Sequence, residues 1–138
     1  MNWKKLWLAA FLVFIAYVAM SLLIHSVILA GEYMKPDIQK ALRPDAEMSG
    51  YFWVRIVIMA VFAFFFTFIF AKGYERKGLM EGIRFGIYVT FFYFLVGTFE
   101  MFVIFPLPYR VVWYWIAAGL VQSVIMGIIA ALVYKPKA

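Results

Sequence analysis

Four apolar runs, each long enough to cross a lipid bilayer as a helix, constrain this chain more than any other feature. A helix rises about 1.5 Å per residue, so roughly 20 apolar residues cross ~30 Å of hydrocarbon. The runs are Leu6–Ala30, Tyr51–Ala71, Phe85–Phe105 and Val111–Tyr134. Membrane-spanning strands would be about 10 residues long and alternate polar with apolar side chains. We therefore expect an all-α membrane protein in which residues 1–138 form a single domain, an antiparallel bundle of four transmembrane helices.

The composition supports this expectation. Apolar residues make up 67% of the chain and charged residues 14%, whereas a soluble domain is near half apolar and a quarter charged. A water-soluble globule and a disordered chain are both excluded. The first run is longer than the apolar core of a signal peptide, and Ile28 stands where a small residue is needed before a cut after Ala30. The sequence thus predicts an uncleaved anchor.

The lysines and arginines indicate how the spans are oriented. Four spans put both termini on one side, together with the loop 72–84, and that side has a large excess of cations. They are Lys4, Lys5, Lys72, Arg76, Lys77, Arg84, Lys135 and Lys137, against Glu75 and Glu81. The other side, with the outer loop 31–50 and the turn Pro106–Pro108, carries as many acids as cations. By the positive-inside rule, we expect a protein of the cell inner membrane with both termini in the cytoplasm.

Several kinds of chemistry are excluded by counts alone. The chain has no cysteine, which removes disulfides, iron–sulfur clusters, thiolate zinc sites and cysteine nucleophiles. Its one histidine, His25, rules out a three-histidine zinc site within one chain. No phosphate-binding glycine motif is present. We expect no cofactor and no metal. The net charge of +6 indicates contact with membrane lipids and topology rather than nucleic acid.

Small residues recur every fourth position in three of the spans. Helices in membranes associate where small residues let their backbones approach. The fourth span has Gly119, Ser123, Gly127 and Ala131, the third has Gly82, Gly86 and Thr90, and the second has Ala63, Thr67 and Ala71. Since a short turn joins the last two spans, we expect their stripes to meet. The alternatives are a symmetric homodimer through the Gly119 stripe, or a spacing that arose by chance.

Three ionisable residues are expected at one depth on the outer side. Ionisable groups within a membrane face protein or water, and helical periodicity places Glu100 on the packing face of its span, with Gly97 and Tyr93. One interpretation is an outward-facing polar pocket in which Glu100 pairs with Arg55 beside His25, for a proton, a headgroup or a quinone carbonyl. The other is structural: Arg55 reaches the headgroups, Glu100 pairs with Arg110, and His25 donates one hydrogen bond.

Two further features are weaker. Gln122 lies near mid-membrane, where a lone glutamine usually bonds to a neighbouring helix, and Tyr93 or Tyr88 are the expected partners; a ligand site is the alternative. In the outer loop, Pro36–Arg43 predicts one or two helical turns that end before Pro44. Such a helix would lie on the membrane surface or bind a partner.

The stretch from Ala71 to Gly86, AKGYERKGLMEGIRFG, resembles a segment of small, uncharacterised four-helix bacterial inner-membrane proteins. The turn Pro106–Pro108 and the ending Tyr134–Pro136 fit the same resemblance. It covers about the last half of the chain and consists of helix boundaries and turn glycines. It implies a bacterial inner membrane and assigns no activity and no functional residue.

Three functions are compatible with these features. The first is a non-enzymatic accessory or structural subunit, either self-associating or part of a larger membrane complex. The second is a small transporter or channel protomer that uses the polar cluster around Glu100. The third is a lipid- or quinone-binding protein or an enzyme, for which Glu100 and His25 would be the acid–base pair.

Overall fold

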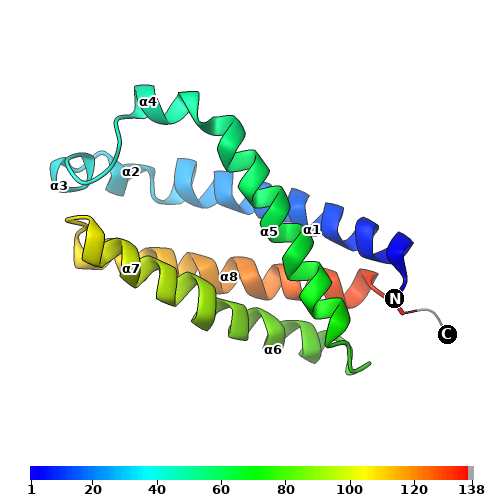
Figure 1. The fold of residues 1–138 in the computed structure, drawn as a ribbon. Coiled ribbons are helices and arrows are strands. Elements are labelled where there is room, and N and C mark those ends of the chain that lie inside the picture. Colours follow the sequence, from blue (N-terminus) through cyan, green and yellow to red (C-terminus); the bar gives the residue numbers. More distant parts are fainter. Residues whose placement is uncertain (137–138) are drawn as a thin grey trace.

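The computed structural model describes residues 1–136, and Lys137, which the topology argument counts, lies outside this range. The described chain is all-helical, and 82% of the residues are in helices (Figure 1). The elements are α1 (Trp3–Leu23), η1 (Ile24–Ile28), α2 (Ala30–Tyr33), α3 (Pro36–Gln39), α4 (Asp45–Gly50), α5 (Phe52–Lys72), α6 (Leu79–Val89), η2 (Thr90–Leu95), α7 (Val96–Ile104) and α8 (Tyr109–Val133). The two η elements are π-helical turns: η1 continues α1 and ends before Leu29, and η2 joins α6 to α7 without a break.

Four continuous helices are long and apolar enough to cross a membrane, which confirms an all-helical chain with four spans. They are Trp3–Ile28, Phe52–Lys72, Leu79–Ile104 and Tyr109–Val133. Three of them begin and end within about three residues of the expected limits, the usual scatter at helix ends. The third was expected from Phe85 but begins at Leu79.

The early start of the third span has a local cause. The buried carboxylate of Glu81 accepts hydrogen bonds from the backbone N–H groups of Glu75, at 2.6 Å, and Lys77, at 3.0 Å. Gly78 then turns the chain with a φ of 69°, a conformation that glycine adopts without strain. The expected loop 72–84 therefore shortens to 73–78, and Glu81 and Arg84 lie in the first turns of α6.

α6 and α8 lie side by side along their lengths (Figure 1). A Cβ atom added to Gly82 would overlap the carbonyl group of Gly127, and one added to Gly86 would overlap the carbonyl group of Ser123. The side chain that covers Gly119 is Phe94. The Gly119 stripe is thus buried within the chain, and a homodimer through it would first require α6 and Phe94 to move away.

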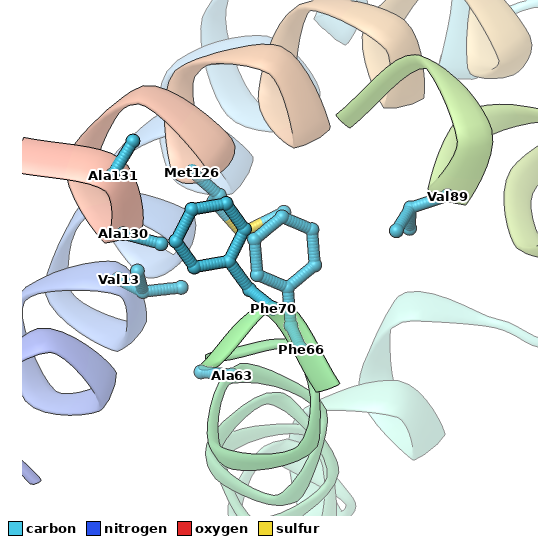
Figure 2. Close-up of a cluster of buried hydrophobic side chains, with 8 residues drawn as sticks. All are labelled: Val13, Ala63, Phe66, Phe70, Val89, Met126, Ala130 and Ala131. Carbon is cyan, nitrogen blue, oxygen red and sulfur yellow. The ribbon is translucent and has the colours of Figure 1, made fainter. Parts of the chain in front are cut away.

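The central core joins all four spans (Figure 2). Phe66 and Phe70 project from α5 toward Met126 of α8, between Val13 of α1 and Val89 of α6. Ala63, Ala130 and Ala131 complete this cluster. A second cluster, formed by Leu6, Ala9, Ala71 and Tyr134, joins the beginning of α1 to the ends of α5 and α8.

The segment from α2 to α4 closes the opposite end of the molecule (Figure 1). Pro36 begins the helix α3, but it ends at Gln39 rather than near Arg43, and Ile38 and Ala41 are buried. Arg110 of α8 holds this segment through Glu32, at 3.0 Å, and Asp37, at 2.9 Å.

Candidate functional site

A polar cavity of about 300 Å³ lies between the spans, in the half of the molecule nearer to α2–α4. Each of the four spans contributes polar side chains to its wall. They are Tyr17 and Ser21 of α1, His25 of η1, Arg55 of α5, Tyr93 of η2, Thr98 of α7, and Trp115 and Gln122 of α8. Apolar side chains such as Met59, Phe62 and Phe94 complete the wall. This volume is enough for a small polar group and several waters.

Gln122 is the most unusual residue of this wall. Its side chain is 3% exposed, and its amide nitrogen has no hydrogen-bond partner in the described part of the chain. Tyr93, one expected partner, lines the same cavity without bonding to it, and Tyr88 is exposed on the surface. A buried polar group without a partner costs about 1–3 kcal/mol. The amide therefore favours any occupant of the cavity that offers an acceptor.

The ring of His25 is held by a side chain of α2. Its Nδ1 lies 2.5 Å from the hydroxyl of Tyr33, and that hydroxyl accepts a hydrogen bond from Nε1 of Trp115 at 2.8 Å. Since the indole N–H can only donate, the Tyr33 proton is available to His25. Burial raises the pKa of the Tyr33 phenol, so this residue stays protonated. The structure thus connects His25 to α2 and α8, not to Glu100.

Arg55 borders the cavity without a counter-charge. None of the ion pairs within residues 1–136 involves Arg55. Among residues 1–136, no carboxylate lines the cavity. The other polar groups of the wall are neutral side chains, most of which can donate a hydrogen bond. The site therefore presents one cation and several donors to whatever occupies it.

Glu100 does not lie on the packing face, which corrects the expectation from helical periodicity. It is exposed, as are Gly97 and Tyr93, whereas Thr98 is buried and Phe94 covers Gly119. The cause is η2: a π-helical turn holds one more residue than an α-helical turn. The face expected at positions 93, 97 and 100 therefore moves by one residue, and Glu100 turns outward.

The two expected ion pairs of Glu100 are also not formed. Arg55 faces the polar cavity, which Glu100 does not line. Arg110 binds Glu32 and Asp37 instead. Of the four candidate residues from the sequence, the structure brings together His25, Arg55 and Gln122 and leaves Glu100 apart.

Several residues of the site were missed in the sequence. Tyr17, Ser21 and His25 follow one another at four-residue intervals, and this spacing on one face of a span was a usable signal. Thr98 could not be assigned without the π-turn. Trp115 and Tyr33 are 82 residues apart in the sequence, and only the folded structure brings them within hydrogen-bond distance.

No group of three potential metal-ligating side chains occurs among residues 1–136. Comparisons with family models, with curated proteins and with solved structures found no match to this chain.

Proposed function

We propose that this chain is an integral protein of the bacterial inner membrane, an antiparallel four-helix bundle with both termini in the cytoplasm. The excess of cations flanking one end supports this orientation. The contact of Leu6, Ala71 and Tyr134 at that same end supports both termini lying on one side. The segment α2–α4 and the polar cavity would then face the outer leaflet.

The absence of cysteine makes the topology easy to test. Single cysteines replace Lys40 in the outer segment or Lys77 in the loop 73–78, and intact cells are treated with a membrane-impermeant maleimide. Lys40→Cys should be labelled in intact cells, and Lys77→Cys only after permeabilisation. The reverse pattern, or labelling of both from outside, contradicts the proposal.

Within that bundle, we propose that the polar cavity binds the polar group of a small membrane-soluble molecule, without catalysis. The observation that carries this proposal is the buried Gln122 amide without a partner, in a cavity that it shares with Arg55. Buried polar groups in proteins are almost always hydrogen-bonded. An occupant with an acceptor atom satisfies Gln122 and removes the cost of leaving it unpaired.

The wall of the cavity favours binding over chemistry. Proton transfer needs a group with a free lone pair near the reacting atom. The described part of the chain places no carboxylate in the cavity wall, and Nδ1 of His25 is bonded to Tyr33. The remaining groups orient a ligand through hydrogen bonds, as in sites where a few polar groups fix the position of a mostly apolar molecule.

A substitution at Gln122 tests the proposal in two ways. Gln122→Leu removes the unpaired amide, so it should raise the melting temperature of the ligand-free protein while reducing the amount of small molecule that co-purifies in mild detergent. Extraction and mass spectrometry measure that amount. Gln39→Leu, on the exposed surface of α3, is the matched control. If Gln122→Leu retains as much of the same molecule as the parent, the cavity is not the binding site.

A further inference from the structure

An apolar groove of about 750 Å³ lies directly beside the polar cavity. It runs between the beginning of α5 and the end of α7 and is covered at one end by α4. Side chains such as Leu42, Met48, Phe52, Ile58, Met101 and Phe105 form most of its wall. A wall of this kind matches the chemistry of a hydrocarbon chain.

The cavity and the groove are joined through one turn of α5. Arg55 and Ile58 line both of them. A molecule whose polar group contacts Arg55 can therefore place an apolar chain in the groove without leaving the guanidinium. The polar cavity and the apolar groove together therefore match the two parts of one amphipathic ligand.

The charged residues around the groove indicate which charge the polar group of the ligand carries. Arg43, the other cation of the groove, is paired with Glu47 at 3.1 Å and lies 4.9 Å from the ring centre of Tyr51. Arg55 has no such partner within residues 1–136. Arg55 is exposed in the first turn of α5, at the end of the span, where the phosphate of a lipid headgroup can reach its guanidinium. A neutral carbonyl would accept hydrogen bonds but would leave this charge uncompensated.

We propose that the site binds an anionic membrane lipid, with its phosphate on Arg55, its headgroup toward Gln122, and one acyl chain in the groove between α5 and α7. This inference rests on the proposed binding function and names its ligand class. Phosphate oxygens accept charge-assisted hydrogen bonds from a guanidinium, and the donors of the cavity are suited to the remaining headgroup oxygens.

The test uses the full-length, delipidated protein in a neutral detergent. Native mass spectrometry and thermal shift measure binding of dioleoyl phosphatidylglycerol and of dioleoyl phosphatidylcholine. The anionic lipid should bind more tightly and raise the melting temperature more. Arg55→Gln should weaken its binding about tenfold or more, because a charge-assisted bond is lost. Lys40→Gln removes an exposed cation of the same outer segment that lines neither the cavity nor the groove, so it should have little effect.

Further ligands separate the parts of the inference. Glycerol 1-phosphate, which lacks the chains, should bind far more weakly than the lipid, and equal binding contradicts a role for the groove. Equal binding of phosphatidylcholine, or full binding by Arg55→Gln, contradicts the anionic class. If a neutral ubiquinone analogue binds instead and Gln122→Leu abolishes that binding, the proposed binding function stands and the anionic lipid is wrong.

Discussion

The backbones of Gly82 and Gly127 meet so closely that a methyl group on either would overlap the carbonyl oxygen of the other. Gly82→Ala and Gly127→Ala should each destabilise the protein by about 1–3 kcal/mol, because α6 and α8 must separate along their length. Thermal or denaturant unfolding in detergent measures the change.

Gly97→Ala is the matched control for these substitutions. A Cβ atom there meets nothing within 4 Å, and alanine is favoured over glycine in a helix by up to about 1 kcal/mol. This variant should be neutral or slightly more stable. Equal losses in all three variants would mean that glycine flexibility, and not close approach, explains the effect.

The sequence predicted this contact between the third and fourth spans. Small residues every fourth position and a short connecting turn both appear in the sequence. The same stripe also fitted a homodimer, and the close contacts of Gly82 and Gly86 with α8 are what favour the contact within the chain. The four spans follow directly, because bilayer thickness sets a minimum length for an apolar helix. Tyr17, Ser21 and His25 show that part of the site was also visible as a polar face.

The position of Glu100 could not be predicted from periodicity, because one π-turn changes the register of everything after it. Nothing in residues 90–95 identifies that turn from the sequence alone. The length of the loop, expected at 72–84 and observed at 73–78, also could not be predicted from local pattern. The charged residues Glu81 and Arg84 suggest a loop in water. Glu81 is nevertheless buried, and its carboxylate accepts hydrogen bonds from the backbone N–H groups of Glu75 and Lys77.

The register after η2 can be tested at two positions. Thr98→Leu should destabilise the protein by about 1–3 kcal/mol, because a larger side chain is forced into a buried position. Glu100→Gln should change stability by less than about 0.5 kcal/mol, as for other exposed positions. Unfolding in detergent measures both. If Glu100→Gln strongly destabilised the protein and Thr98→Leu left its stability unchanged, Glu100 would lie on the packing face, as simple helical periodicity predicts.

A hydrogen bond between hydroxyls joins α6–η2 to α8. Thr90 Oγ1 and Ser123 Oγ lie 2.7 Å apart, and each hydroxyl also contacts a carbonyl oxygen of its own helix, that of Gly86 or Gly119. A double-mutant cycle of Thr90→Ala and Ser123→Ala should give a coupling energy of about 0.6–1.7 kcal/mol.

Thr67 provides the control for this cycle. It is fully buried but bonds only to the carbonyl of Ala63 in its own helix. Thr67→Ala combined with Ser123→Ala should therefore be additive. Similar coupling in both pairs would mean that the energy reports general packing and not the hydroxyl contact.

The loop 73–78 depends on Glu81 and contains one residue in an unfavourable conformation. Arg76 has a φ of 64°, which costs a non-glycine residue about 1–2 kcal/mol. Arg76→Gly should therefore be neutral or stabilising, although it removes a charge. Glu81→Leu should expose the Glu75 and Lys77 amides, and hydrogen exchange followed by mass spectrometry of peptide 73–81 should accelerate. Unchanged exchange in this variant would contradict the capping role.

The ion pairs that connect Arg110 to Glu32 and Asp37 in the segment α2–α4 should weaken at low pH. Hydrogen bonds from Lys35, and then from Arg110, lower the pKa of Glu32 below its ordinary value of 4.5, and the Arg110 guanidinium lowers the pKa of Asp37 below 3.8. Groups with a lowered folded-state pKa contribute their full stability above their ordinary pKa and lose it as the pH falls through the folded value.

Nitroxides attached to cysteines introduced at the exposed positions Gln39 and Tyr114 report the distance between α3 and α8. Their distance distribution should stay narrow from neutral pH down to these ordinary values and broaden at lower pH. In Arg110→Gln it should be broad at every pH, whereas Arg43→Gln, whose ion pair lies outside this contact, should behave as the parent does. A distribution that stays narrow in Arg110→Gln at neutral pH would show that buried Ile38 and the Tyr33–Trp115 bond hold the segment without the ion pairs.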